Sequence, residues 1–244
     1  LPHRAAVTRV GLLFPGSMGA AVGAAAQAEV LWASDGRSDA TARRAAAFRD
    51  VGTVAELVGA SEVVLSICPP AIAEEVAEQV FALGFEGTFV EANAITPERM
   101  RRIAALGERV VDGSIIASKG IHLYLAGAGS EQVAELFGGT DVTAIPLDAE
   151  IGAASALKMA FGGWNKIGIA LTAQAHAIAR AYGVEDRLEA EGIPEDRLPR
   201  VADRAWRWAP EMDEIADTCL EVGWPEAIPR AAGSFYRELS QERA

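Results

Sequence analysis

One of the three lysines in the 244-residue chain, Lys158, stands in an apolar segment where its ammonium group could do chemistry. Residues 152–165 read Gly-Ala-Ala-Ser-Ala-Leu-Lys-Met-Ala-Phe-Gly-Gly-Trp-Asn, and these small and apolar residues predict a buried helix face. Burial favours the neutral amine and would lower the pKa of Lys158 from about 10.4 towards neutrality, as a general acid or base requires. Two ordinary interpretations stand beside this one: a side chain that reaches solvent from the helix start, or an ion pair with Asp148 or Glu150.

Asn165 follows Lys158 by seven residues, which places the two side chains on one helix face, two turns apart. We therefore expect Asn165 to assist the lysine. Histidines, cysteines and carboxylates show no spacing typical of metal ligands, so the sequence predicts no metal site. A Gly-x-Ser-x-Gly segment is also missing, which argues against hydrolases that carry their serine nucleophile in that turn.

A glycine-rich turn, Phe-Pro-Gly-Ser-Met-Gly at 14–19, follows the first predicted strand and opens the first predicted helix. Glycine there lets the backbone approach a pyrophosphate, whose charge is favourable at a helix N-terminus. The last two glycines of the Gly-x-Gly-x-x-Gly pattern are present, and Phe14 replaces the first. A tight turn without a ligand is the alternative. The strand–turn–helix–strand context favours a dinucleotide site formed by Gly16, Ser17, Met18 and Gly19.

The segment Ala-Ser-Asp-Gly-Arg-Ser at 33–38, after the second predicted strand, bears on which nicotinamide cofactor binds. A carboxylate there suits the ribose 2′-hydroxyl of NAD, whereas arginine and hydroxyl donors suit the 2′-phosphate of NADP. Asp35 favours NAD. The donors that a phosphate needs stand beside it in Ser34, Arg37 and Ser38. We predict NADP as the cofactor, with NAD as the less favoured alternative.

The charge balance excludes several classes of partner. The chain has 34 acidic against 22 basic residues, a net charge of −12, and half of its residues are hydrophobic. Such a surface repels phosphate backbones and anionic lipid, so we expect no nucleic-acid and no membrane partner. Two cysteines, Cys68 and Cys219, are too few for a disulfide scaffold and indicate a reducing compartment. The sequence predicts a soluble cytoplasmic protein.

The N-terminal region allows two interpretations. Arg4 and Arg9 precede an uncharged stretch at 10–28, as in a signal peptide. The alternative is a strand at 7–14, a turn at 15–19 and a helix at 20–28. We favour the second, because Pro15 and the glycines of the turn would interrupt a signal helix in its middle.

Short β-rich runs alternate with alanine-rich helical runs over the first 150 residues. Several runs are continuously apolar, which indicates strands buried on both faces of a parallel, doubly wound sheet. The predicted strands are 9–13, 30–33, 63–67, 88–91, 110–112, 123–126 and 142–145. The predicted helices include 38–48, 71–82, 97–105 and 131–137.

A long helix at 151–182, with Gly183 as its C-cap, marks the change to a helical region. Three shorter helices are expected between 194 and 239, punctuated by Pro199, Pro210, Pro225 and Pro229. We place a domain boundary between 149 and 150, giving an α/β domain at 1–149 and a helical substrate and dimerisation domain at 150–244.

Six segments, in this order, resemble the β-hydroxyacid dehydrogenase superfamily over nearly the full length: 10–19, 32–38, 66–70, 91–97, 111–116 and 156–159. Within it the chain is similar to the 6-phosphogluconate dehydrogenase-like, NADP-binding branch with a short helical C-terminal domain. The resemblance implies a Rossmann-type cofactor domain. It also implies an NADP-dependent oxidoreductase that transfers hydride between nicotinamide and a small hydroxy acid or related carbonyl compound.

The resemblance also implies roles for individual residues. Lys158 would take the hydroxyl proton as hydride leaves. The glycine-rich turn would bind the pyrophosphate through its amides, and Arg37 and Ser38 would hold the 2′-phosphate. Cys68, Pro69 and Pro70 would form the loop beside the cofactor, and Asn93 would approach the nicotinamide ribose. Ser114, Ile115 and Ile116 would bind substrate.

Two departures from the family pattern bear on the substrate. The family usually has Asn four residues after the lysine, where this chain has Gly162, and Asn165 is the candidate to replace it. Residues 116–119 read Ile-Ala-Ser-Lys in place of the family's Ser-Gly-Gly loop. An imine reductase-like C=N reduction and a non-catalytic NADP-binding protein remain the alternatives. The lysine favours carbonyl–alcohol chemistry, because related imine reductases generally lack it.

The helical region is rich in aromatic residues that a small domain would struggle to bury. Core packing is their ordinary role, yet a domain of under a hundred residues around one long helix gains stability by pairing with a copy of itself. We predict a homodimer through the C-terminal helices. The aromatic residues concerned are Trp206, Trp208, Trp224, Phe235 and Tyr236.

Overall fold

The computed structural model describes residues 8–195 and 201–241. These residues fall into two compact units, one up to Lys158 and one from Met159 onwards. The predicted domain boundary between 149 and 150 stays a prediction. Pro199, and the residues of the N-terminal region before Thr8, lie outside the described residues.

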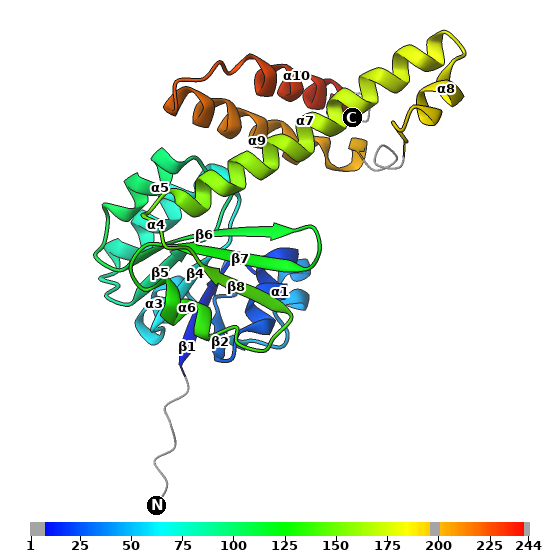
Figure 1. The fold of residues 1–244 in the computed structure, drawn as a ribbon. Coiled ribbons are helices and arrows are strands. Elements are labelled where there is room, and N and C mark those ends of the chain that lie inside the picture. The colour runs from blue at the N-terminus through cyan, green and yellow to red at the C-terminus, as the bar shows by residue number, and fades with distance from the viewer. Residues whose placement is uncertain (1–7, 196–200, 242–244) are drawn as a thin grey trace, which may run out of the picture. The chain divides into compact units, whose positions relative to one another are not determined.

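An eight-stranded, mostly parallel sheet forms the first unit (Figure 1), as the doubly wound α/β prediction requires. Its strand order is β3-β2-β1-β4-β5-β6-β7-β8, so the order reverses beside β1, which lies between β2 and β4. In such sheets ligands bind outside the carboxyl ends of the strands at the reversal point. The strands are β1 (Arg9–Leu13), β2 (Glu29–Trp32), β3 (Arg49–Asp50), β4 (Val63–Ser66), β5 (Thr88–Glu91), β6 (Val110–Ala117), β7 (Ile121–Ala126) and β8 (Val142–Pro146).

Helices cover both faces of the sheet. Leu57, Val76 and Met100 bring α3, α4 and α5 onto one face, where they pack with Phe89 of β5. On the other face, residues of α1 and α6 pack against β1, β4 and β5. The helices of this unit are α1 (Ser17–Ala25), α2 (Asp39–Arg44), α3 (Val54–Ala60), α4 (Ala73–Ala82), α5 (Pro97–Ala104) and α6 (Ser130–Glu135), with a 3-10 turn, η1 (Pro70–Ile72), before α4.

The N-terminal region folds as strand, turn and helix, so that interpretation is confirmed over the described residues. Three elements differ from prediction. The helix predicted at 38–48 is the shorter α2, and β3 follows it as a two-residue strand that carries too little sequence to show a pattern. The helix α3 had no predicted counterpart, although Thr53 and Glu56 at its start form a capping box.

The last two strands correct the prediction of an all-parallel sheet. β6 is five residues longer than predicted and pairs antiparallel with β7, from Asp112 opposite Ala126 to Ala117 opposite Ile121. Only residues 118–120 join the two strands, and Gly120 takes a positive φ of 108°. A parallel crossover needs a dozen or more residues, so this short connection can form only a hairpin. β8, reached through α6, then pairs parallel with β7.

A buried carboxylate from β6 fixes the start of the long helix α7 (Ala153–Ala181). Asp112 Oδ2 accepts hydrogen bonds from the backbone amides of Gly152 at 2.8 Å and Ala154 at 2.9 Å. Asp112 Oδ1 accepts from the amide of Ser155 at 3.2 Å and from its hydroxyl at 2.7 Å. The first amides of a helix have no partner within it, and here a residue some forty positions away supplies one.

The second unit is helical. Besides the rest of α7 it contains α8 (Glu185–Ala190), α9 (Val201–Glu221) and α10 (Ala227–Gln241). α7 ends as predicted at Gly183, where φ is 68° and the amide of Val184 donates back to the carbonyl of Ala179 at 2.9 Å. No helix among the described residues is both long and apolar enough to span a bilayer.

Pro210 corrects the prediction that each proline ends a helix. It lies inside α9 with its ring exposed. Proline costs a helix hydrogen bond, but the buried face of α9 continues from Trp208 to Met212 across it. Trp208 packs edge-on against Tyr236 of α10, with ring centroids 5.3 Å apart. Packing on this face outweighs the lost hydrogen bond, so α9 runs on as one helix.

We expect Asp112→Ala to lower the free energy of unfolding by about 2–4 kcal/mol, because it leaves the buried amides at the start of α7 without an acceptor. Ser155→Ala is the matched control and should cost about 1 kcal/mol, since the carboxylate and its backbone donors stay in place. Urea unfolding of both variants measures the difference. A loss below that of Ser155→Ala would show that the carboxylate does not hold the helix.

Candidate functional site

The glycine-rich turn connects β1 to α1 as predicted. Gly16 is the N-cap of α1, and no side chain caps that end of the helix. A Cβ built on Gly16 would meet only the carbonyl oxygen of Phe14, at 3.9 Å, so the space beside the turn is open. Gly19 is tighter, because its Cβ would lie 3.0 Å from the same oxygen. Uncapped amides beside open space are what a pyrophosphate needs, and Ser17 and Met18 occupy the first turn.

Phe14 has an unusual backbone conformation. Its φ of 59° makes it the one non-glycine residue with positive φ among those described. It occupies the first position of the glycine pattern, where a residue without Cβ would adopt this conformation at no cost. The aromatic ring lies under the guanidinium of Arg37, with 3.8 Å between Arg37 Cζ and the ring centroid. Phe14 therefore shapes the turn and contacts Arg37, the residue predicted to bind the 2′-phosphate.

Arg37 is a partly desolvated cation. Its Nε is buried without a hydrogen-bond partner in the described structure. Burial lowers the pKa of Arg37, while the proximity of Cys68 and Asp35 opposes that shift. Arg37 is thus placed between the segment after β2 and the segment after β4, both of which the sequence assigns to the cofactor. A desolvated guanidinium with a free N–H favours an anion.

The two serines beside Arg37 already have structural roles. Ser38 caps α2, because its hydroxyl oxygen accepts a hydrogen bond from the amide of Thr41 at 3.3 Å. Ser34 hydrogen-bonds Asp50 and thereby lowers the pKa of that carboxyl, after the larger effect of the Gly52 amide. The carbonyl of Ser34 accepts from the amide of Arg37 at 3.0 Å, which shapes the loop. Their contact with a phosphate stays a prediction.

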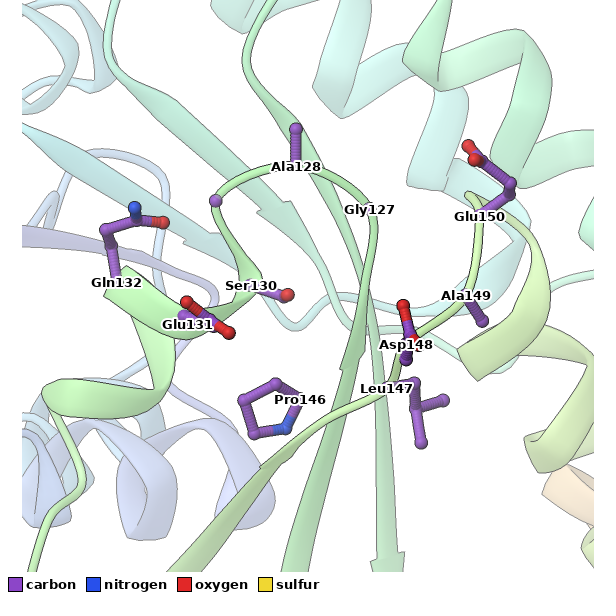
Figure 2. Close-up of a pocket in the computed structure, with 11 residues that line it drawn as sticks. Gly127, Ala128, Ser130, Glu131, Gln132, Pro146, Leu147, Asp148, Ala149 and Glu150 are labelled. Atoms are coloured by element: carbon purple, nitrogen blue, oxygen red, sulfur yellow. The ribbon is translucent and has the colours of Figure 1, made fainter.

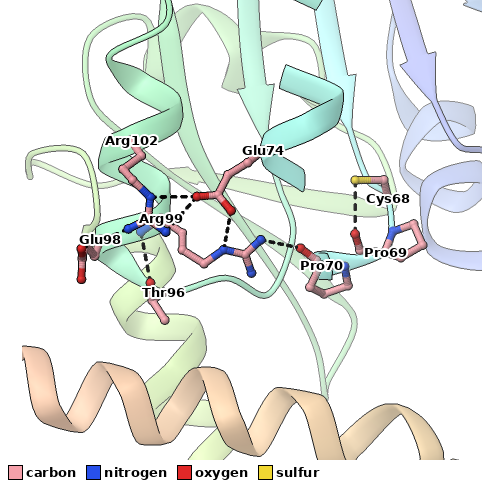
Figure 3. A network of polar contacts seen from close by, with 8 residues as sticks. All are labelled: Cys68, Pro69, Pro70, Glu74, Thr96, Glu98, Arg99 and Arg102. Carbon is pink, nitrogen blue, oxygen red and sulfur yellow. Dashed lines mark hydrogen bonds and ion pairs between the residues drawn. The ribbon is translucent and has the colours of Figure 1, made fainter. Parts of the chain in front are cut away.

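The predicted cofactor loop at 68–70 is held by an ion-pair network (Figure 3). Arg99 of α5 donates to Glu74 of α4 at 2.9 Å and to the carbonyl of Pro70 at 2.9 Å. Arg102 adds a second ion pair to Glu74 at 2.8 Å. These arginines lower the pKa of Glu74 below its usual value, even though burial acts in the opposite direction. The loop therefore has a fixed position at the end of β4.

A cluster of buried polar side chains lies at the carboxyl ends of β4 and β5. The Glu91 carboxylate accepts from the amide of Asn93 at 3.0 Å. Asn93 Nδ2 in turn contacts Ser66 Oγ at 3.4 Å and Cys68 Sγ at 3.2 Å. Asn93, predicted to approach the nicotinamide ribose, thus orders the loop that contains Cys68. Sequence reasoning did not select Glu91 or Ser66, although Glu91 was visible as a charge ending an apolar strand.

Burial controls the ionisation of this cluster. Loss of solvent raises the pKa of Glu91 to about 8, and the nearby Asp112 adds to the shift. Burial and the proximity of Glu91 raise the pKa of the Cys68 thiol to about 12. Cys68 therefore stays a neutral thiol at physiological pH and cannot serve as a nucleophile. Desolvation likewise raises the pKa of Asp112, against the effect of its helix-capping hydrogen bonds.

The structure brings Lys158 to the predicted substrate strand. Lys158 Nζ donates to the backbone carbonyl of Ile115 at 2.6 Å. Ile115 lies beyond the part of β6 that pairs with β5, which ends at Asp112, so that strand does not take its carbonyl. Ser114 and Ile116 flank it and are both buried. Ser114 Oγ has no hydrogen-bond partner among the described residues. Lys158 itself is half-buried.

Asn165 lies on α7 in the second unit, half-buried, and its predicted cooperation with Lys158 stays a prediction. Gly162, which stands where the family has asparagine, lies close to a charged side chain. A Cβ at Gly162 would come within 2.9 Å of Glu211 Oε1. Glu211 is held there by a buried ion pair with Lys166, 2.6 Å long. Any larger residue at 162 would therefore displace this pair, which sequence reasoning missed because its members lie 45 residues apart.

One pocket of the described structure is lined by none of the predicted site residues. It has a volume of about 700 Å³ and lies between the turn after β7 and the segment from β8 to α7 (Figure 2). Glu131, Asp148 and Glu150 line it. Three carboxylates repel the phosphates of a dinucleotide, so this pocket does not suit the predicted cofactor.

One group among the described residues has the composition of a metal site: His176, Glu185 and Glu195 have ligand atoms within 4.8 Å of one another. Arg180 already forms ion pairs with both carboxylates, at 2.7 Å to Glu195. His176 Nε2 is also engaged, 2.9 Å from the carbonyl oxygen of Ile193. A cation there would have to compete with a guanidinium, and the arrangement serves to hold α8 against α7.

Comparisons with known proteins agree with this fold. Residues 179–239 match a domain of unknown function, DUF1932. A conserved protein of unknown function, described as similar to 3-hydroxyacid dehydrogenases, shares 25% identity, with a TM-score of 0.74 over 96% of this chain and 98% of its own. A search of curated proteins finds no match.

Two enzymes of known activity share the fold at lower identity. The 3-hydroxyisobutyrate dehydrogenase of Mycobacterium tuberculosis, solved with L-serine, is 15% identical with a TM-score of 0.76, covering 98% of this chain and 95% of its own. A reductive aminase of Aspergillus terreus, solved with NADPH, is 17% identical with a TM-score of 0.57, covering 97% and 94%. These findings confirm the predicted resemblance to the β-hydroxyacid dehydrogenase superfamily.

We expect Glu91→Gln to remove a pH dependence of stability. Because the folded-state pKa of about 8 lies above the usual 4.5, Glu91 contributes stability below about pH 4.5 and loses it as pH rises through 8. The difference in unfolding free energy between variant and wild type should therefore shift in favour of the variant by a few kcal/mol from pH 5 to 9, at about 1.4 kcal/mol per pKa unit.

Urea unfolding at pH 5, 6, 7, 8 and 9 measures this difference. The exposed Glu78 provides the control, and Glu78→Gln should show no such trend. Parallel stability curves for Glu91→Gln and wild type would show that Glu91 ionises normally in the folded protein.

Proposed function

This chain has the fold of the β-hydroxyacid dehydrogenase superfamily. We propose that the protein is an NADP-dependent oxidoreductase. It transfers hydride between nicotinamide and a small hydroxy acid or related carbonyl compound. The observation that carries this proposal is the 2.6 Å hydrogen bond from Lys158 Nζ to the carbonyl of Ile115. It holds an amine, which can give or take a proton, at the predicted substrate strand.

The residues present fit a bound dinucleotide. The turn at Gly16 is open on the side where a Cβ would stand, and the amides of the first turn of α1 have no capping side chain. Both features suit a pyrophosphate. The orphaned Nε of Arg37 suits a further phosphate, which only NADP carries on its adenosine ribose. NAD, supported by the exposed Asp35, remains the less favoured cofactor.

The proposed mechanism assigns a role to Lys158, Ser114 and Asn93. A bound nicotinamide supplies hydride to a carbonyl or accepts it from an alcohol. Lys158 gives a proton to the substrate oxygen in reduction and takes it in oxidation, while the Ile115 carbonyl keeps its Nζ oriented. Ser114, whose hydroxyl has no partner within the described residues, donates a hydrogen bond to a substrate oxygen. Asn93, fixed by Glu91 and Ser66, orients the nicotinamide ribose.

The substrate class is supported by one similar structure and by the chemistry of lysine. L-serine, found with the Mycobacterium tuberculosis enzyme, is a 3-hydroxy acid. The reductive aminase of similar fold keeps C=N reduction as the second candidate. Lys158 favours the first, because a positioned amine can give a proton to a substrate oxygen or take one from it as hydride is transferred. A non-catalytic NADP-binding protein is the third.

The thiols of Cys68 and Cys219 are both free. A protein of the reducing cytoplasm keeps its thiols in this state, and the cytoplasm is the location that we propose. The excess of negative charge supports the further expectation that the chain takes a small molecule as its partner and neither nucleic acid nor a membrane surface.

Lys158→Ala should lower kcat/KM by about 10²–10⁴-fold, because general acid–base help is removed, while the dissociation constant for NADPH stays within about threefold of wild type. The assay follows NADPH at 340 nm with a panel of 3-hydroxy acids, the matching carbonyl compounds and cyclic imines. Arg109→Ala, which removes an exposed cation directly before β6, is the control and should keep full activity.

Each result of this assay separates the candidates. Turnover of hydroxy acids that Lys158→Ala loses supports the proposal. Turnover of imines alone moves the chain to the second candidate. Cofactor binding without turnover of any compound leaves the non-catalytic protein, and undiminished turnover by Lys158→Ala shows that another group transfers the proton.

We also propose that the chain forms a homodimer through α7. Four large apolar side chains repeat along one side of this helix at spacings of seven, seven and four residues, with the small Gly168 and Ala175 between them. This exposed apolar stripe consists of Trp164, Leu171, Ile178 and Tyr182, which are 84%, 66%, 65% and 82% exposed.

A second copy of the chain fits this stripe. Alternating large and small residues at spacings of three and four let two such helices pack with the side chains of one in the gaps of the other. A groove of about 450 Å³ between α7 and α10, lined by Leu171 and Ile228, continues the apolar surface. The stripe alone exposes on the order of 600 Å², near the ~800 Å² per partner of a standard interface.

Wild-type protein should have about twice the chain mass of 25.6 kDa in light scattering at micromolar concentration. The double variant Leu171→Asp, Ile178→Asp should be monomeric, because both side chains are exposed in the single chain and their charges oppose pairing. Val222→Asp, exposed to a similar degree but outside the stripe, should stay dimeric. A wild-type mass that stays at one chain would contradict the dimer.

A further inference from the structure

Phe14 is the residue of the glycine-rich turn whose presence the dinucleotide pattern does not explain. Its φ of 59° lies in the left-handed region, which a non-glycine residue adopts at a cost. Glycine would meet the same backbone requirement without strain. Because the backbone alone does not account for a phenylalanine at this position, we look to its side chain for the explanation.

The side chain of Phe14 packs partly against the core, and it also makes one specific contact with a charged group. The guanidinium of Arg37 lies over the ring, 3.8 Å from its centroid, well within the ~6 Å range of a cation–π interaction. Stacking on a ring face leaves the N–H groups at the edge of the guanidinium free for an anion. Burial lowers the pKa of Arg37 in this position.

Arg37 is incompletely compensated in this position. Its Nε is buried without a partner in the described part of the chain, and Asp35, which attracts it electrostatically, is itself exposed. A guanidinium fixed in place and partly desolvated binds an incoming phosphate without first losing side-chain freedom or water. A flexible surface arginine would lose both.

We propose that Phe14 is a positioning residue for cofactor selection: its ring holds Arg37 for the adenosine 2′-phosphate, so that the first position of the turn sets the preference for NADP over NAD. This inference rests on the proposed function. Loss of the Phe14 ring should therefore weaken binding of NADP and leave binding of NAD unchanged.

The test compares NADPH and NADH binding to four proteins by quenching of tryptophan fluorescence: wild type, Phe14→Gly, Arg37→Ala and the double variant. Wild type should prefer NADPH. Phe14→Gly should weaken NADPH binding about 5–20-fold, the range of a partly desolvated cation–π contact, and leave NADH binding within twofold. In the double variant the glycine should add no further loss, because its effect passes through Arg37.

Two comparisons separate positioning from a structural role. Phe14→Tyr keeps the ring and should keep the NADPH preference. Phe14→Gly relieves the backbone strain but also removes a ring that packs partly against the core, so some loss of melting temperature is expected whatever the role of Phe14. The selectivity therefore decides: a purely structural role would weaken NADPH and NADH binding together.

Failure of the inference and failure of the proposed function give different results. Equal loss of NADPH and NADH in Phe14→Gly, or additive losses in the double variant, overturns the role of Phe14 while the oxidoreductase stands. Wild-type preference for NADH overturns NADP and the inference with it. Absence of binding in wild type that Phe14→Gly restores would show that the ring closes the phosphate turn, which overturns both.

Discussion

The hydrogen bonds from the start of α7 to the buried carboxylate of Asp112 are the contact on which the proposed site depends. Asp112 lies in β6 opposite the last residue of β5 on one side and opposite Ala126 of β7 on the other. The three backbone amides held there fix both the position and the direction of the helix. Lys158 comes one turn later, so its reach to the carbonyl of Ile115 follows from where the helix begins. Without this cap the lysine would have no defined relation to the substrate strand.

The β6–β7 hairpin supplies the other half of that geometry. Since β5 ends opposite Asp112, the next residues of β6 have β7 on one side and no strand on the other. Lys158 donates to the carbonyl of Ile115 in this outer part of β6. Gly113 makes the transition possible, because a Cβ there would come within 2.9 Å of the carbonyl oxygen of Glu91. A helical crossover in place of the hairpin would have covered this edge.

The local parts of this arrangement could be predicted from the sequence, and the long-range parts could not. Continuous apolar runs and the glycine-rich turn identified β1, α1 and most of the parallel sheet. Antiparallel β7 was missed because strand patterns carry no direction, and only the three-residue connection reveals it. The stacking of Arg37 on Phe14 brings together two segments that the sequence assigns separately to cofactor binding. Their contact depends on the register of β1 with β2, which a single sequence does not state.

The buried charged groups of the first unit differ in how they are compensated, and this difference points to the ligand. Asp112 is buried among hydrogen-bond donors, whereas Glu91 is neutral over most of the physiological range because burial raises its pKa to about 8. Three buried side-chain atoms remain without partners in the described chain: Arg37 Nε, Glu91 Oε2 and Ser114 Oγ. They belong to the segment after β2, the end of β5 and the outer part of β6. Folded proteins leave few such atoms unsatisfied, and two of the three, on Arg37 and Ser114, belong to residues that the sequence assigns to cofactor and substrate. A ligand that brings an anion to Arg37 and an oxygen to Ser114 would satisfy two of the three. The acidic pocket beside β8 is lined by none of the residues that carry these atoms, so unmet hydrogen bonding points to a different part of the first unit.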